Sequence, residues 1–377
     1  MDISILKDKF GIHTFMLTYT KLTFTEYRRL LKLFMSSISD RSDDYSYIKT
    51  NLLFDNGYYG IYPELYYKCD HRYLCVFVNP RNLLESRFCT YEIMGSDMSV
   101  YIEKLVSQID EALKLIADDY NIYAFENAYL TRVDLCVNYF FDKSYIIGQY
   151  IRLAKKSVHI NSGRLRGLYI KGRYDEVGNR HHFGLDKYNF ELTIYDKSFE
   201  LMRLEKIPEF DDEFGNVLRI EVKLKRRYIA NTLGDLDEPV PSNIDRLLYI
   251  LSESRFIMID SLNKVFYSGD YLQRDLLEEV IRNSSFQSHI KEIMVKIISE
   301  NDNIDNVYDN IAMDYELPKK TIQRLKSKFK KLGVNSTPIS TQDSENDELF
   351  LPGFANLLMC EDIKQNQDKT SESNEVQ

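Results

Sequence analysis

Apolar and polar positions follow two different periods along the chain. Over Thr23–Phe34 and Asp97–Tyr120, apolar residues recur at helical spacing, which predicts two amphipathic helices. Other runs alternate and are rich in β-branched and aromatic residues, which predicts strands at 73–79, 129–141, 190–196 and 218–225. Strands interleaved with helices predict an α+β fold, with an antiparallel-rich sheet and flanking helices.

The pattern changes after the turn-rich segment GDLDEPVPSN at 234–243. From Ile244 to Gly333 it is helical, with no further strand pattern. This region closes with a helix, a short turn ending at Pro318 and a basic helix, the outline of a helix-turn-helix. We therefore predict an α+β catalytic domain over 1–240, a smaller all-helical, DNA-binding domain over 241–335, and an acidic disordered tail over 336–377.

Two segments near the end of the chain each allow two interpretations. The basic helix either contacts DNA, with Arg324 as a candidate, or is a solvated helix without a partner. Its cations are Lys319, Lys320, Arg324, Lys326, Lys328, Lys330 and Lys331. In the predicted tail, the apolar run at 349–359 either binds a partner or docks back onto the protein.

Charge and composition narrow the class of protein only slightly. The net charge is -9, but residues 341–377 hold nine Asp or Glu and two Lys and supply -7 of it, so a nucleic-acid partner is not excluded. No uncharged apolar run approaches the ~18 residues of a membrane span, and no signal peptide is evident, so we expect a cytoplasmic protein without a membrane partner. The 5 cysteines form no C-x-x-C pair and predict reduced packing residues.

The run TRVDLCVN at 131–138 holds the first candidate for chemistry. Alternation places Arg132, Asp134, Cys136 and Asn138 on one strand face, opposite three apolar residues. A carboxylate in the middle of a strand needs a cation or hydrogen-bond donors. Asp134 is therefore either a metal ligand or the partner of Arg132 in a structural ion pair.

Two further strands carry polar faces. Glu221, Lys223 and Lys225 share a face of VLRIEVKLKRRY at 217–228. An acid beside several cations suits a metal and phosphate site, although an exposed strand with alternating charges has the same pattern. In the strand at 190–196, Glu191 and Tyr195 share a face. The chain has 28 tyrosines, so alternation alone does not single out Tyr195.

A basic, glycine-bearing stretch at 162–184 comes before that strand. Glycines let a backbone approach a phosphate while cations contact it, which fits binding of a DNA strand, and a solvated hairpin fits equally well. Adjacent His181 and His182 point to opposite faces of a strand, so they are poor joint ligands for one metal. The cations proposed to contact DNA here are Arg164, Arg166, Lys171 and Arg173.

Four blocks in order carry a resemblance to a known family. VFVNPRNLLES, LTRVDLCVN, LTIYDKSFEL and VLRIEVKLKRRYIANTLG together resemble the gene II replication endonucleases of filamentous phages and, more distantly, the initiators of rolling-circle plasmids of Gram-positive bacteria. The resemblance spans about Val76 to Gly234. Tyr195 and Lys197 match the family's Y-x-K, which E-L follows. The chain lacks the H-x-H metal motif of better-known initiators and relaxases.

The resemblance implies an enzyme that nicks one strand at the origin of a circular genome. Tyr195 would attack a phosphodiester, stay joined to the 5′ end and release a 3′ hydroxyl. The expected cofactor is Mg²⁺ or Mn²⁺, held by Asp134 and Glu221, with Glu191 added from its place beside Tyr195. Lys197 would assist at the phosphate. Further DNA contacts are expected from Arg132, Lys223, Lys225 and Arg226, and the expected partners are single- and double-stranded origin DNA and a host helicase and polymerase.

The main alternative is a non-catalytic DNA-binding regulator. Its helix-turn-helix near 304–331 would read an operator while the α+β domain serves assembly. It predicts DNA binding without cleavage and without metal dependence. A tyrosine recombinase would need an all-helical catalytic domain, and the strand around Tyr195 argues against that class.

Overall fold

The structure is a computed structural model. It describes residues 3–5, 10–44, 46–116, 123–159, 163–167, 169–170, 173–174, 176–204, 215–234, 242–300, 302–339 and 350–359. The strands are β1 Ile3–Ile5, β2 Gly11–Thr20, β3 Ile38–Arg41, β4 Tyr47–Thr50, β5 Ile61–Lys68, β6 His71–Val78, β7 Tyr129–Phe141, β8 Arg164–Arg166, β9 Tyr169–Ile170, β10 Arg173–Tyr174, β11 His182–Asp186, β12 Phe190–Asp196, β13 Asn216–Lys225, β14 Tyr271–Leu272 and β15 Phe350–Leu351. The helices are α1 Phe24–Phe34, α2 Leu52–Asp55, α3 Pro80–Leu84, α4 Met98–Lys114, α5 Ser144–Ser157, α6 Glu176–Arg180, α7 Lys197–Arg203, α8 Arg226–Gly234, α9 Asn243–Ser252, α10 Ser254–Asn263, α11 Arg274–Asn283, α12 Ser288–Ser299, α13 Ile304–Asp314, α14 Lys319–Lys331 and α15 Phe354–Leu357, with 3-10 turns η1 Met35–Ser37 and η2 Phe125–Asn127.

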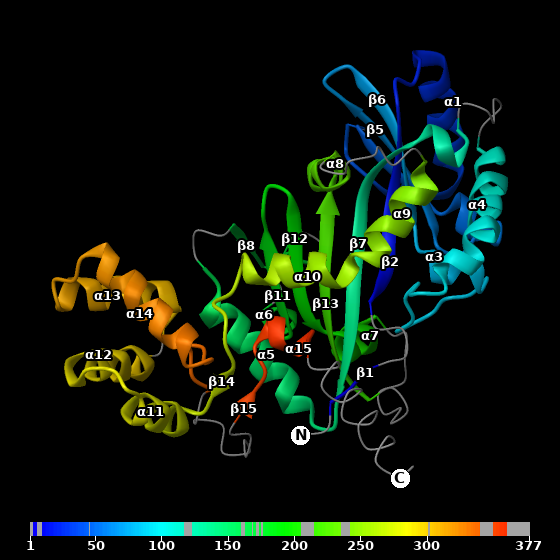
Figure 1. The fold of residues 1–377 in the computed structure, drawn as a ribbon. Coiled ribbons are helices and arrows are strands. Elements are labelled where there is room, and N and C mark those ends of the chain that lie inside the picture. Colours follow the sequence, from blue (N-terminus) through cyan, green and yellow to red (C-terminus); the bar gives the residue numbers. More distant parts are fainter. Residues whose placement is uncertain are drawn as a thin grey trace, which may run out of the picture.

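One large antiparallel sheet organises the first two thirds of the chain (Figure 1). Its strand order is β3-β4-β5-β6-β2-β7-β13-β12-β11-β8, and β1 pairs with the far end of β7. The central β7 has 13 residues, which is long enough to pair with β2 and β1 along one edge and with β13 along the other. The predicted α+β class, with an antiparallel-rich sheet and flanking helices, is confirmed.

Local sequence signals account for several element boundaries. α1 begins after Thr23, which forms a reciprocal capping box with Glu26. β7 and β12 have the predicted bounds, because each is an alternating run with turn residues at its end. α4 ends at Lys114, earlier than the predicted Tyr120, and residues 117–120 lie outside the described ranges.

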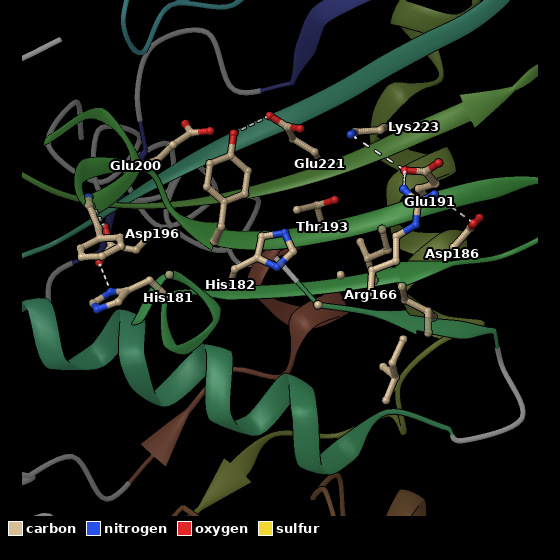
Figure 2. A pocket seen from close by; sticks show the side chains of 18 of the residues that line it. Arg166, His181, His182, Asp186, Glu191, Thr193, Asp196, Glu200, Glu221 and Lys223 are labelled. Carbon is tan, nitrogen blue, oxygen red and sulfur yellow. Dashed lines mark hydrogen bonds and ion pairs between the residues drawn. The ribbon is translucent and has the colours of Figure 1, made fainter. Parts of the chain in front are cut away.

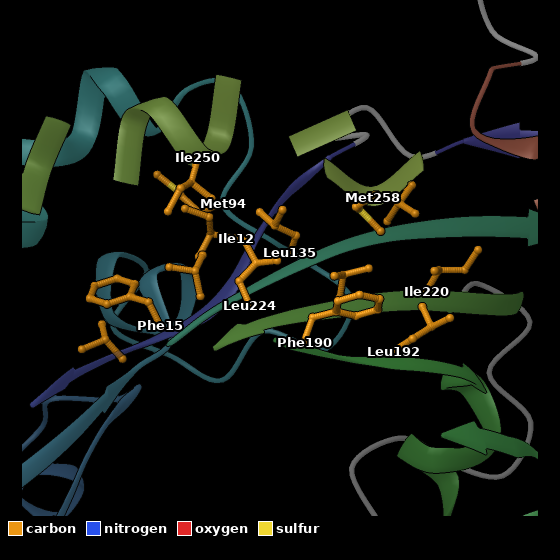
Figure 3. Close-up of a cluster of buried hydrophobic side chains, with 14 of the residues drawn as sticks. Ile12, Phe15, Met94, Leu135, Phe190, Leu192, Ile220, Leu224, Ile250 and Met258 are labelled. Carbon is orange, nitrogen blue, oxygen red and sulfur yellow. The ribbon is translucent and has the colours of Figure 1, made fainter. Parts of the chain in front are cut away.

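The hydrophobic core lies on one face of the sheet. Ile12, Leu135 and Ile220 project from β2, β7 and β13 toward Ile250 of α9 and Met258 of α10 (Figure 3). α1 packs on β4, β5 and β6, and α5 packs on β7, β11, β12 and β13. These helices leave the opposite face of the sheet to polar and aromatic side chains.

A second core lies among α11 to α14, which form a group beside the sheet in Figure 1. It contains Leu277, Ile297, Ile311 and Leu325. α9 and α10 belong to the first core, because their apolar residues cover the sheet. The division between the two cores therefore falls after α10 and not at the predicted position 240/241, where only the turn-forming composition marks a change.

The segment at 350–359 docks onto the protein. β15 pairs with β14, so the region after Ile244 holds a short strand that the helical pattern did not predict. The ring of Phe354 lies 4.5 Å from that of Phe266 and 5.6 Å from that of Tyr150. The prediction of a disordered tail is wrong for 350–359 and for 336–339, because both segments bury side chains in the fold. Residues 340–349 and 360–377 lie outside the described ranges.

The cysteines agree in part with the prediction of packing residues. Cys75, Cys89 and Cys136 are buried free thiols. Cys69 is exposed, because it lies in the turn between β5 and β6, so the prediction is wrong for this residue. Cys360 lies outside the described residues. Within the described chain, no helix is both long enough and apolar enough to span a bilayer.

Docking of the C-terminal segment predicts a stability difference between two phenylalanines. Phe354 is 2% exposed, so Phe354→Ala should lower the free energy of unfolding by ~3 kcal/mol. Phe350 is 45% exposed, and Phe350→Ala should cost less than ~1 kcal/mol. Urea denaturation of both variants measures this, and equal small losses would show that the docked segment does not support the core.

Candidate active site

The polar positions of β7, β13 and β12 meet on one face of the sheet. Directly opposed residues of an antiparallel pair share a face, so the register groups the candidates. Lys223 lies opposite both Asp134 and Glu191, and Glu221 lies opposite both Cys136 and Thr193. We call the following set the polar face: Asp134, Cys136, Asn138, Glu191, Thr193, Tyr195, Arg219, Glu221 and Lys223.

A cavity of about 990 Å³ opens on this face at the β11–β12–β13 end (Figure 2). α7 closes one end of the face, where Leu201 packs with Tyr91 and Val217. The cavity lining includes Arg166, His181, His182, Glu191, Tyr195, Glu221 and Lys223. Residues from four separate sequence segments therefore line one cavity.

Tyr195 lies near the end of β12 and is 8% exposed. Its hydroxyl donates a hydrogen bond of 2.7 Å to Oε1 of Glu221. Burial, and then the Glu221 charge, raise the pKa of Tyr195 well above the ordinary value, while Arg219 acts in the opposite direction. The tyrosine is consequently a neutral phenol at neutral pH, held in one orientation by the carboxylate.

Glu221 stays ionised despite its burial. Burial acts to raise the pKa of its carboxyl group, but the charges of His13, Arg219 and Lys223 outweigh it and lower the pKa to about 2. Nη1 of Arg219 lies 3.8 Å from Oε1 of Glu221. The carboxylate is therefore ionised over the whole physiological pH range, and it accepts the hydrogen bond from the phenol.

Arg219 is a functional candidate that sequence reasoning missed. It is fully buried, and it donates from Nε to Oδ1 of Asn138 at 2.6 Å and from Nη2 to the Tyr91 carbonyl at 2.9 Å. Its Nη1 has no hydrogen-bond partner among the described residues. The block RIEVKLKRRY contained the signal, because Arg219 lies two residues before Glu221 and so shares its strand face.

Lys197 is the first residue of α7, which Asp196 caps. It is buried, it forms an ion pair with Glu200, and its Nζ lies 5.8 Å from the centre of the Tyr195 ring. Burial, and then Arg219, lower the pKa of Lys197. The predicted Tyr195 and Lys197 pair is therefore brought together, with a cation of increased acidity beside the phenol.

Asp134 is paired with its strand neighbour. Arg132 donates to both carboxylate oxygens, from Nε at 2.7 Å and from Nη2 at 2.5 Å, and Thr14 donates to Oδ2 at 2.5 Å. Burial raises the pKa of Asp134, and the Arg132 hydrogen bonds oppose that rise. The structural ion pair considered for Asp134 is present in the structure.

Glu191 also has basic partners. Nη1 of Arg166 lies 2.9 Å from its carboxylate, and Nζ of Lys223 and Nζ of Lys225 each lie at 3.9 Å. Among the described residues, no three His, Cys, Asp or Glu side chains are grouped where they could hold a metal ion. The three predicted ligands, Asp134, Glu191 and Glu221, do not form one coordination sphere in this arrangement.

Histidines form part of the surroundings. His13, which the sequence did not single out, lies at a β-bulge in β2, and its Nδ1 is buried without a hydrogen-bond partner in the described part of the chain. Burial lowers the pKa of His13 to about 3, although Glu221 opposes the shift. His182 is opposite Tyr195 in the ladder, while His181 stacks on Phe199. The two adjacent histidines thus have different partners, and both line the cavity.

The other predicted DNA contacts are dispersed. Arg164 and Arg166 are exposed on β8, and Arg226 lies over the ring of Tyr129 at 5.3 Å. Lys225 is bound to Asp186. Arg324 is exposed on α14, which forms the predicted helix-turn-helix outline with α13. Lys171 lies outside the described residues. For Arg173 the structure describes the backbone, which is part of β10, and not the side chain.

Comparisons with known proteins give little direct information. No protein-family model and no curated protein matches the chain. Among solved structures, the chain is similar to a rolling circle replication initiator protein from Geobacillus stearothermophilus, with 11% sequence identity and a TM-score of 0.27. The match covers 75% of this chain and 90% of that chain. A likeness of this size establishes neither a shared fold nor a shared function.

The buried position of His13 predicts a pH effect on stability. His13 takes up a proton near its ordinary pKa of 6.5 in the unfolded chain, but only near 3 in the folded chain. Protons therefore bind preferentially to the unfolded chain below pH 6.5, and the free energy of unfolding decreases as the pH falls from 6.5 toward 3. Between about pH 7 and about pH 4.5 the wild type should lose ~2–3 kcal/mol more unfolding free energy than His13→Asn. Urea denaturation at both pH values measures the difference, and parallel losses would contradict the assignment.

Proposed function

We propose that this chain is a DNA-nicking enzyme that starts rolling-circle replication, with Tyr195 as the nucleophile. The observation that carries the proposal is the Tyr195–Glu221 hydrogen bond of 2.7 Å inside a cavity lined by cations. The ordered resemblance to phage gene II endonucleases and plasmid initiators gives the reaction class. A tyrosine held against a carboxylate beside a lysine and an arginine fits transfer of a phosphodiester to a phenol.

The reaction requires two proton movements. As the Tyr195 oxygen bonds to phosphorus, its proton passes to the Glu221 carboxylate. The bond from phosphorus to the 3′ oxygen breaks, and that oxygen takes a proton from Lys197. Concerted transfer suits a phenol of raised pKa, because its acidity increases only as the new bond to phosphorus forms.

Cations around the cavity are proposed to position the phosphate. Lys223 lines the cavity, whereas Arg219 is fully buried beside Glu221, with its Nη1 3.8 Å from Oε1 of that residue. Arg166 is paired with Glu191, so an incoming phosphate would compete with that carboxylate for the guanidinium group. The product is DNA with a covalent 5′ end and a free 3′ hydroxyl, which a host polymerase and helicase would extend and unwind.

We also propose, from the resemblance, that the reaction requires Mg²⁺ or Mn²⁺. Such an ion, when bound, would neutralise charge that develops on the phosphate. Asp134, Glu191 and Glu221 supply the oxygen ligands that these ions prefer. Asp134 and Glu191 are occupied by Arg132 and Arg166, so binding would require these arginines to move.

A second candidate function is the non-catalytic regulator. The observation in its favour is the exposed basic surface of α14, where Lys320, Arg324 and Lys331 are exposed. Such a helix fits binding to DNA phosphates or to a groove. This function accounts for α14 but gives no role to the buried Tyr195 and Glu221 pair.

Loss of the Tyr195 hydroxyl is expected to abolish nicking. With supercoiled circular DNA carrying the origin of the chain's own replicon, wild type should yield open circles with protein on the 5′ end. Tyr195→Phe keeps the ring but should lower the rate by at least about a thousandfold. Glu221→Gln, which removes the proton acceptor, should lower it by ~10²–10⁴.

Tyr101→Phe is the matched control, because Tyr101 is exposed on α4 at the other side of the sheet. It should nick as wild type does. Retained nicking by Tyr195→Phe would move the chemistry to another residue. DNA binding by wild type without any nicking would favour the regulator.

Metal dependence is a separate prediction. EDTA should stop nicking by wild type, and excess Mg²⁺ or Mn²⁺ should restore it, as measured by the fraction of open circles. Asp134→Asn should require a higher ion concentration for half-maximal rate, because it removes a charged ligand. Full activity in EDTA would refute the ion's role and leave the tyrosine assignment intact.

A further inference from the structure

The polar face continues across β2 into a surface of aromatic rings. In the β5–β6 ladder, Tyr62 lies opposite Phe77 and Tyr66 lies opposite Tyr73. Tyr47 of β4 lies opposite Tyr66 in the next ladder. We call Tyr47, Tyr62, Tyr66, Tyr73 and Phe77 the aromatic face.

These rings are not part of a hydrophobic core. All five are half-buried, and none belongs to the three apolar clusters of the described residues or packs against them. Tyr66 and Tyr73 stack on each other, with centroids 4.9 Å apart and planes 6° apart. The sheet therefore presents aromatic surface that its own core does not use.

Hydrogen bonds fix part of this surface. The hydroxyls of Tyr47 and Tyr66 donate to the buried carboxylate of Glu64, at 3.3 Å and 2.8 Å. Nζ of Lys49 lies 3.5 Å from the same carboxylate and 5.7 Å from the centre of the Tyr62 ring. The carboxylate thus has three partners and holds the rings of Tyr47 and Tyr66, and Tyr73 stacks on the second of these.

The aromatic face and the candidate active site are continuous. Arg132 lies 5.3 Å from the centre of the Phe77 ring and is hydrogen-bonded to Asp134 on the polar face. At ~4.8 Å per strand, the five steps from β12 to β5 span roughly 24 Å. A DNA strand leaving Tyr195 across the sheet would therefore reach the aromatic rings after a few nucleotides.

We propose that the aromatic face binds single-stranded DNA next to the nick, by stacking of bases on Tyr62, Tyr73 and Phe77. The inference rests on the proposed function for its choice of DNA as the substrate. Half-buried rings with nearby cations suit unpaired bases and their phosphates, whereas a duplex keeps its bases stacked inside. Lys49 and Arg132 supply the cations at the two sides of this surface.

The test measures binding of a fluorescently labelled oligothymidylate of about 16 nucleotides by fluorescence anisotropy. EDTA is present, so the measurement reports binding without cleavage. The double variant Tyr62→Leu, Tyr73→Leu keeps apolar bulk but removes two rings, and its Kd should rise at least about tenfold. Tyr73→Phe keeps the ring and should bind as wild type. Tyr101→Leu, at a tyrosine that is 41% exposed on α4, is the matched control and should also bind as wild type.

A second measurement does not depend on the folding of any variant. Wild type cross-linked to the same oligonucleotide carrying 5-iodouracil should give adducts on peptides from β5 and β6. Adducts confined to other elements would overturn the proposal. So would equal affinities of the double variant and Tyr101→Leu.

The outcome is separable from that of the nicking assay. Ring-dependent binding without nicking would support the aromatic face and refute only the catalytic role of Tyr195. Nicking by Tyr195 with ring-independent binding would refute the aromatic face alone.

Discussion

The register of β7, β13 and β12 is the constraint on which the rest of the site depends. It places Glu221 of β13 between Cys136 of β7 on one side and Thr193 of β12 on the other. It also places Arg219 directly opposite Tyr195. A shift by one residue would turn Tyr195 and Glu221 toward the core and bring Ile194 and Ile220 to the cavity. The apolar residues on the other face, packed under α9 and α10, prevent that shift. The hydrophobic core and the proposed chemistry are thus set by the same pairing.

Burial and charge balance explain why this arrangement is compatible with a stable fold. Each carboxylate of the polar face has a donor: Arg132 for Asp134, Arg166 for Glu191 and the Tyr195 hydroxyl for Glu221. The one cation of the polar face that is fully buried, Arg219, has an Nη1 donor without a hydrogen-bond partner among the described residues.

Alternation along single strands was sufficient to predict the polar positions of β7, β12 and β13, because each of these strands buries one face. It was insufficient for partners distant in sequence. The pairing of Glu191 with Arg166 and the contact of Arg219 with Tyr91 depend on the sheet order, which no local pattern encodes. β2, with His13, was missed, as was β5, where Pro63 interrupts the strand signal. The helix-turn-helix outline was local and was predicted. The division of the two cores after α10 was not predicted, because α9 and α10 pack on the sheet through contacts that are distant in sequence.

The position of the covalent bond between protein and DNA is the measurement that decides the role of Tyr195. Wild type that has reacted with its origin DNA would be digested with nuclease and trypsin, and the adduct sequenced by tandem mass spectrometry. Cleavage after Lys187 and Lys197 gives a peptide with both Tyr188 and Tyr195, so fragment ions must separate the two. We predict a nucleotide on Tyr195, with Tyr188 unmodified. A nucleotide on any other residue, or nicked DNA without a protein adduct, would contradict it.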